Sequence, residues 1–120
     1  MKRDWDLYRT LILHVEEHAD VDGGWIEVPI SLTAREATDH IIMLEKDGMI
    51  EVQDCRNKTK STAIFPTNLT ARGRDFCELS RVDSTWSATL SAISKKTGTV
   101  TLGMLIQKLS ETNDYLLNKY

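Results

Sequence analysis

The spacing of apolar residues near the start of the chain is that of a helix with one hydrophobic face. Apolar residues recur at helical intervals, at Trp5, Leu7, Tyr8, Leu11, Ile12 and Val15. Asp4 is a suitable N-cap, and the polar, glycine-containing stretch 20–24 ends the pattern. A helix is predicted over about residues 5 to 18.

A different pattern follows in residues 25–30. This run alternates in part between apolar and polar side chains and is rich in β-branched residues, which is typical of a short strand. Pro29 has no N–H to donate, so we expect the strand at a sheet edge, or Pro29 near the strand's end.

Thr33 and Glu36 have the spacing of a capping box, in which each side chain accepts a hydrogen bond from the other residue's backbone N–H. The helix that follows carries one apolar face, formed by Ala37, Ile41 and Leu44. Gly48 can adopt the left-handed conformation, which would let Met49 contact Leu44 in a Schellman motif. The predicted helix covers residues 34–47.

The next segment predicts a β-hairpin with a cationic tip. Residues 50–54 alternate as a strand, and residues 62–65 can return antiparallel to them before Pro66 interrupts. The segment between the two runs is polar and basic, and its cations are Arg56, Lys58 and Lys60.

The remainder of the chain is helical by pattern. Helices are expected over about residues 70–81 after Thr70, 84–95 after Asp83 or Ser84, and 102–118 after Thr101. The last helix has an apolar stripe made of Leu102, Leu105, Leu109 and Leu116, widened by Ile106, Tyr115 and Leu117. Such a stripe needs a partner. It either completes the core by packing on the first helix or forms the interface of a two-fold homodimer.

The composition is that of an ordinary globular protein. A length of 120 residues with 41% hydrophobic and 28% charged residues favours a single domain. We expect residues 1–66 to form its core and residues 67–120 a helical extension packed on it. No apolar run reaches the roughly 18 to 20 residues of a membrane span, and the start lacks a signal-peptide core. Cys55 and Cys77 are too few for a disulfide framework, so we predict a cytoplasmic protein with free thiols.

The net charge of -3 is distributed unevenly along the chain. Residues 1–60 hold 8 Lys and Arg against 13 Asp and Glu, whereas residues 61–120 hold 7 against 5. Proteins that bind nucleic acid by bulk neutralisation of phosphates usually carry a cationic surplus. Any DNA binding by this chain would therefore depend on a local cluster of cations and not on its overall charge.

Helix, strand, helix and basic-tipped hairpin, in this order, are the layout of a winged helix. Residues 40–50, His-Ile-Ile-Met-Leu-Glu-Lys-Asp-Gly-Met-Ile, resemble the end of a winged-helix recognition helix and its entry into the wing. The usual helix before the recognition helix is replaced here by the strand and turn of residues 25–32. The expected fold class is α+β, a winged helix-turn-helix-like domain followed by C-terminal helices.

Further motifs narrow the resemblance. The chain opens with Met1-Lys2-Arg3-Asp4-x-Asp6-Leu7-x-Arg9, and after the 40–50 stretch come Leu69-Thr70-x-x-Gly73-x-Asp75-Phe76 and Trp86. In this order, over nearly the whole chain, they resemble a domain-of-unknown-function family of small bacterial and prophage-encoded proteins with a predicted winged-helix fold. The resemblance implies a phage or prophage protein that acts in the bacterial cytoplasm.

The fold implied by this resemblance suggests a transcriptional regulator that binds duplex DNA. The wing residues Arg56, Lys58 and Lys60 would clamp phosphates. On the side of helix 34–47 away from its apolar face, the base-reading positions would be Arg35, Thr38 and Asp39. A simpler interpretation exists for each set: a solvated basic tip that discourages edge pairing, and an ordinary exposed helix face.

The composition of helix 34–47 favours a different function. Its cations, Arg35 and Lys46, are outnumbered by its acids, and winged-helix regulators often place a cation where this chain has Ile42 and Met43. An exposed Ile42 suits a protein interface better. The alternative is a winged helix without DNA binding that acts as adaptor or inhibitor of a host or phage protein. Its possible interface residues are Ile42, Met43, Leu105, Leu109 and Leu116.

No catalytic grouping stands out in the sequence. His14-Val15-Glu16-Glu17-His18 matches the H-x-x-E-H pattern of inverted zinc peptidases, but no scaffold that would supply a third ligand accompanies it. We interpret the match as a coincidence and His40 as a structural histidine beside the core. The sequence therefore predicts a protein that is not an enzyme and has neither a metal nor a cofactor.

Overall fold

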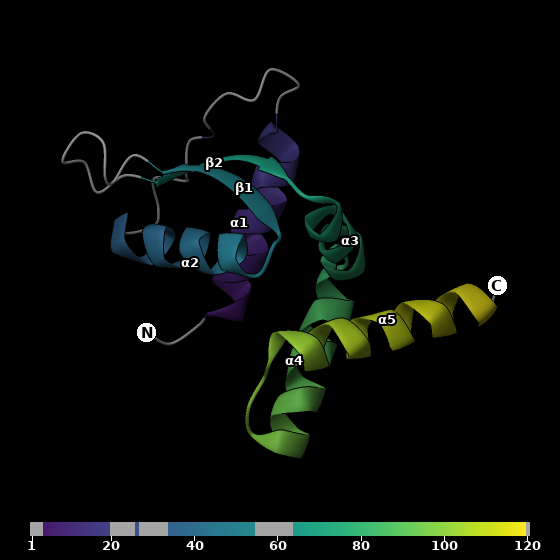
Figure 1. Ribbon diagram of the computed structural model, residues 1–120. Coiled ribbons are helices and arrows are strands. Elements are labelled where there is room, and N and C mark those ends of the chain that lie inside the picture. The colour runs from purple at the N-terminus through teal and green to yellow at the C-terminus, as the bar shows by residue number, and fades with distance from the viewer. Residues whose placement is uncertain (1–3, 20–25, 27–33, 55–63, 120) are drawn as a thin grey trace. The chain divides into compact units, whose positions relative to one another are not determined.

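The computed structural model describes residues 4–19, 26, 34–54 and 64–119 (Figure 1). In this part of the chain the fold is α+β, with five helices and one two-stranded antiparallel sheet. The elements are α1 (Trp5–His18), α2 (Ala34–Lys46), β1 (Ile50–Asp54), β2 (Ile64–Leu69), α3 (Ala71–Ser80), α4 (Asp83–Thr97) and α5 (Leu102–Lys119). The chain divides into two compact units, Met1–Cys77 and Glu78–Tyr120, so most of α3 belongs to the first. None of the described helices is long and apolar enough to cross a membrane.

Helix α1 begins and ends where its pattern predicts. The Asp4 side chain accepts a hydrogen bond from the Leu7 N–H at 3.1 Å, which satisfies one of the unpaired donors at the helix start. The buried face consists of Leu7, Tyr8, Leu11, Ile12 and Val15. Helices α1 and α2 both pack against the hairpin, and this apolar face forms much of the core of the first unit (Figure 1).

Helix α2 ends in the predicted Schellman motif. Gly48 has a φ of 76°, the left-handed region that favours glycine. The Met49 N–H donates to the Leu44 carbonyl at 2.9 Å, and the Gly48 N–H donates to the Glu45 carbonyl at 3.0 Å. The chain thereby turns directly from α2 into β1. Thr33, the expected cap at the other end of the helix, lies outside the described residues.

Two side chains tie α2 to α1. The His40 ring is buried. Its Nε2 accepts a hydrogen bond from the Asp4 N–H at 3.0 Å, and its Nδ1 is hydrogen-bonded to the Glu36 carbonyl oxygen at 2.9 Å. The ring lies buried between the start of α1 and α2, which agrees with the interpretation of His40 as a structural histidine beside the core. Near the other end of α2, the buried Tyr8 hydroxyl donates to an Asp47 carboxylate oxygen at 2.8 Å.

Strand β2 continues through Pro66 to Leu69, so the prediction that Pro66 interrupts the strand is wrong. The Pro66 carbonyl accepts from the Ile26 N–H at 2.9 Å. The N–H and C=O of one residue point to the same edge of a strand. Since the Pro66 carbonyl points away from β1, the N–H that proline lacks costs the β1–β2 pair no hydrogen bond. The register also shifts at this point: Glu51 pairs with Asn68 and Val52 with Pro66, which leaves Thr67 as a bulge.

Of the strand predicted over residues 25–30, only Ile26 lies among the described residues. Ile26 is buried, and its bond to Pro66 places it at the edge of β2 opposite to β1.

The start of α3 lies on the turn that ends α2, and we call this contact the α2–α3 junction (Gly48, Met49, Thr70 and Gly73). The Thr70 hydroxyl caps α3 by accepting from the Gly73 N–H at 3.0 Å, and it donates to the Gly48 carbonyl. The Thr70 N–H donates to the Met49 carbonyl at 3.0 Å. A Cβ on Gly73 would overlap that same carbonyl oxygen, so no other residue fits without a shift of the backbone.

The second unit contains α4 and α5, which pack against each other. Thr101 caps α5 as predicted, with its hydroxyl accepting from the Met104 N–H at 3.2 Å. The predicted cap of α4, Asp83 or Ser84, is wrong: Val82 is the N-cap, without a side-chain hydrogen bond, and Asp83 lies in the first helical turn. An acidic residue at that place still interacts favourably with the helix dipole.

We expect Gly73→Ala to lower the free energy of unfolding by at least about 2 kcal/mol, because the new methyl group meets a backbone carbonyl that cannot rotate away. Urea unfolding followed by circular dichroism measures the change.

Gly103→Ala is the matched control. Gly103 is also helical, but a Cβ there meets nothing within 4 Å, so the same substitution should leave stability unchanged or raise it by up to about 1 kcal/mol. Equal stability of the two variants would contradict the role assigned to Gly73.

Candidate nucleic-acid interface

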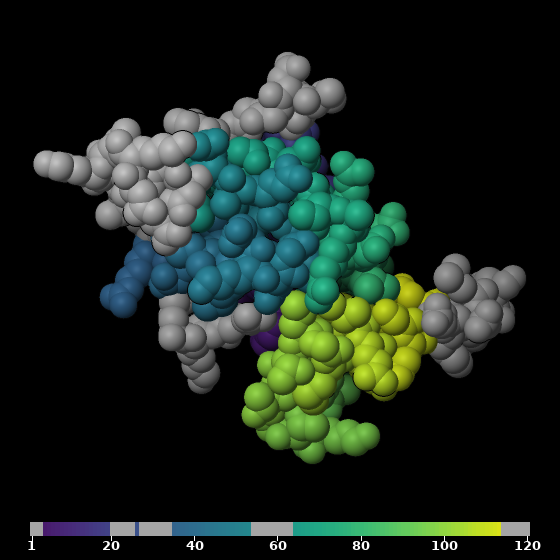
Figure 2. Space-filling view, viewed as in Figure 1, coloured from purple at the N-terminus to yellow at the C-terminus, as the bar shows by residue number. Residues whose placement is uncertain are grey.

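Helix α2 lies at the surface on the side shown in Figure 2, where residues 34–46 appear in blue and teal. The predicted base-reading residues Arg35, Thr38 and Asp39 come from this helix: Arg35 is exposed, and the other two are half-buried. The Arg35 Nε lies 4.0 Å from an Asp39 carboxylate oxygen, with the two side chains 92% and 31% exposed. An exposed pair at this distance holds Arg35 only weakly.

Helix α2 carries three acids against two cations. Glu36 and Glu45 are exposed and Asp39 is half-buried, whereas the cations are Arg35 at the start of the helix and Lys46 at its end. A carboxylate near a phosphate oxygen is repelled, and the repulsion extends over about 8 Å at physiological salt. The middle of α2 is therefore a poor surface for the DNA backbone.

Ile42 and Met43, the residues that stand where regulators often have a cation, are both half-buried. They leave part of their apolar surface accessible between the acids of α2. A small apolar centre with a charged surround is typical of a protein interface.

The leucines of the predicted stripe differ in accessibility. Leu105 and Leu109 are fully buried within the chain itself, and thus present no surface to a second copy or to another protein. Leu116 lies in the part of α5 whose side chains are outside the described residues.

The predicted wing residues Arg56, Lys58 and Lys60 also lie outside the described residues. Asp54 and Ile64 form the last described pair of the hairpin, and the chain between them carries the three cations. Cys55 is outside as well, whereas Cys77 is fully buried with its Sγ 3.7 Å from the Ile12 carbonyl oxygen.

The H-x-x-E-H match folds as part of α1. The ring centroids of His14 and His18 lie 4.1 Å apart, and the His18 Nδ1 is hydrogen-bonded to the His14 carbonyl oxygen at 3.0 Å. Among the residues that the structure describes, no group of three or more His, Cys, Asp or Glu side chains could hold a metal ion.

A pocket between α4 and α5, with Lys96 and Lys108 on its wall, was not singled out from the sequence. Its lining comes from two separate segments, residues 92–97 of α4 and 104–111 of α5, and only the packing of the two helices brings these together. The remaining signal in the sequence, an excess of cations in residues 61–120, does not locate it.

Comparisons with known proteins support the part of the resemblance that concerns an uncharacterised family. The family described as "Hypothetical protein (DUF2513)" matches residues 2–99. An uncharacterized protein of Haemophilus influenzae is 26% identical over 110 residues, which cover 89% of this chain and 91% of that protein. No solved structure matches. Because the family match extends from the start of the chain through the whole of α4, the chain belongs to the DUF2513 family.

Proposed function

We propose that the first unit is a winged-helix module that binds duplex DNA and regulates transcription of a phage or prophage. The observation that carries this proposal is the direct passage from α2 through the Gly48 turn into the hairpin of β1 and β2. In a winged helix, the recognition helix leads into the wing in the same way. The bond between Ile26 and Pro66 supports the proposal, because it brings one residue of the strand predicted over residues 25–30 to the outer edge of β2.

In this proposal most of the affinity for DNA comes from the wing, because of the way the charges are distributed along the chain. Since α2 has more acids than cations, its Arg35 and Thr38 would add base contacts but little attraction to phosphates. Arg56, Lys58 and Lys60 lie in the sequence between β1 and β2, with no acid among residues 55–63. In this proposal they hold the backbone and position α2 at the groove.

We expect the triple variant Arg56→Ala, Lys58→Ala, Lys60→Ala to weaken binding of random and sequence-specific duplexes to a similar extent. The slope of log affinity against log salt should fall by about 0.9 for each phosphate that the variant no longer neutralises. Fluorescence anisotropy of the purified protein with labelled duplexes, at low and at physiological salt, measures both quantities.

The control carries the same change of net charge at the other end of the chain. Lys95, Lys96 and Lys108 are exposed residues of the second unit, and their triple substitution by Ala should leave the salt slope unchanged. An unchanged slope in the wing variant, or no binding by the wild type even at low salt, would refute DNA binding through the wing.

A second candidate function is a protein-binding module, an adaptor or inhibitor of a host or phage protein. The observation that favours it is the half-buried pair Ile42 and Met43 on an acidic helix. A partner for this surface would present a small apolar patch with basic side chains around it.

The variant Asp39→Asn, Glu45→Gln distinguishes the two functions. If α2 approaches DNA, removal of two negative charges and release of Arg35 from Asp39 should raise the affinity for duplex about three- to tenfold at low salt. If α2 binds a protein, the affinity for DNA should not respond. The same anisotropy assay measures the effect.

Asp75→Asn together with Glu78→Gln makes the same charge change on exposed positions of α3. A rise of equal size in this control pair would mean that net charge alone, and not the position of α2, sets the affinity.

A further inference from the structure

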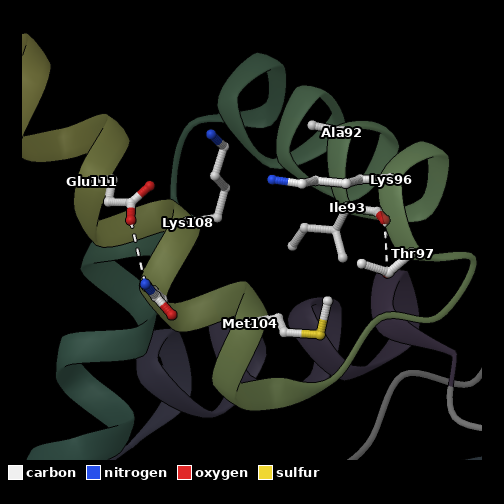
Figure 3. A pocket seen from close by; sticks show the side chains of 8 residues that line it. Ala92, Ile93, Lys96, Thr97, Met104, Lys108 and Glu111 are labelled. Atoms are coloured by element: carbon white, nitrogen blue, oxygen red, sulfur yellow. Dashed lines mark hydrogen bonds between the residues drawn. The ribbon is translucent and has the colours of Figure 1, made fainter.

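Helices α4 and α5 line a pocket of about 290 Å³ that is open to solvent in the second unit (Figure 3). Its wall is formed by Ile93, Lys96 and Thr97 of α4 and by Met104, Lys108 and Glu111 of α5. Small-molecule sites in proteins start at about this volume. The space corresponds to roughly ten water molecules in the liquid, so it suits a small ligand.

One side of the pocket is apolar. Ile93 is buried, Met104 is half-buried, and the two side chains point into the same space (Figure 3). Of the polar lining, the Thr97 hydroxyl is already hydrogen-bonded to the Ile93 carbonyl at 2.9 Å. These residues offer a ligand mainly hydrophobic contact.

The other side of the pocket is charged, with two lysines and one glutamate in its lining. Lys96 extends from α4 and Lys108 from α5, both beside the pocket (Figure 3). Within the described part of the chain neither ammonium group has an ion pair or a hydrogen-bond partner. The nearby carboxylate of Glu111 accepts a hydrogen bond from the Gln107 amide at 3.4 Å instead. An anion placed between two ammonium groups is attracted by both of them.

We propose that this pocket binds a small carboxylate with an apolar body. The carboxylate lies between Lys96 and Lys108, and the apolar part lies against Ile93 and Met104. The apolar side distinguishes this ligand from inorganic phosphate, and the lysine pair distinguishes it from a neutral hydrophobic molecule. The site lies entirely within the second unit and does not depend on DNA binding by the first.

Octanoate, kept below its micelle-forming concentration, is a suitable probe because it joins a carboxylate, for the lysine pair, to an apolar chain, for Ile93 and Met104. Titration of the isotope-labelled full-length protein should give saturable NMR shifts centred on residues around Ile93 and Met104. The double variant Lys96→Gln, Lys108→Gln should bind octanoate at least tenfold more weakly. Both lysines are exposed, so circular dichroism should show an unchanged fold.

Lys95→Gln is the matched control: it removes one charge from the same helix, but Lys95 does not line the pocket. Its affinity for octanoate should stay within twofold of the wild type. The single variants Lys96→Gln and Lys108→Gln serve the same comparison if the double variant loses its fold.

Two further probes test the two sides of the pocket separately. Octanol at its solubility limit and inorganic phosphate should each bind at least tenfold more weakly than octanoate. The proposal is overturned if either binds as tightly as octanoate, if shifts do not saturate, or if the lysine variants and the Lys95 control bind equally well.

Discussion

The arrangement of the first unit depends on the close approach of Gly73 to the Met49 carbonyl. At this point the chain leaves the hairpin and starts α3 directly over the turn that ends α2. Thr70 satisfies polar backbone groups on both sides of the contact, so three elements share one set of hydrogen bonds. Since Tyr8 and His40 hold α2 from the side of α1, the position of α2 is determined from two directions.

The parts of the fold that the sequence predicts are those decided within a few residues. Asp4, Thr70 and Thr101 each cap a helix that starts immediately after them, and Gly48 reverses the chain within one turn of α2. In each case the group and its partner are close in the chain, so spacing alone identifies them. The helices can be predicted for the same reason, because the residues of each apolar face are three or four positions apart in the chain.

The parts that escape prediction depend on residues far apart in the chain. Pro66 is tolerated in β2 because its backbone groups face the edge opposite to β1, and this orientation depends on the register of the β1–β2 pairing, which no local rule gives. Leu105 has the same spacing whether its partner is in this chain or in another, and only the packed structure shows that it is buried. The candidate residues of α2 can be identified from the sequence, because they lie on one helix away from its apolar face. The lysine pair of the second unit cannot, because two helices must pack before the lysines share a pocket. The wing cations lie outside the described residues and stay a prediction.

The bond between Ile26 and Pro66 also bears on how the protein behaves at high concentration. An open strand edge is a template on which a second molecule can add a strand, and the sheet can then grow from chain to chain. At Pro66 the outer edge of β2 has no N–H to offer, and its carbonyl is already engaged. An incoming strand therefore finds no matching ladder at that position, so addition of a strand at this point of the β2 edge is disfavoured.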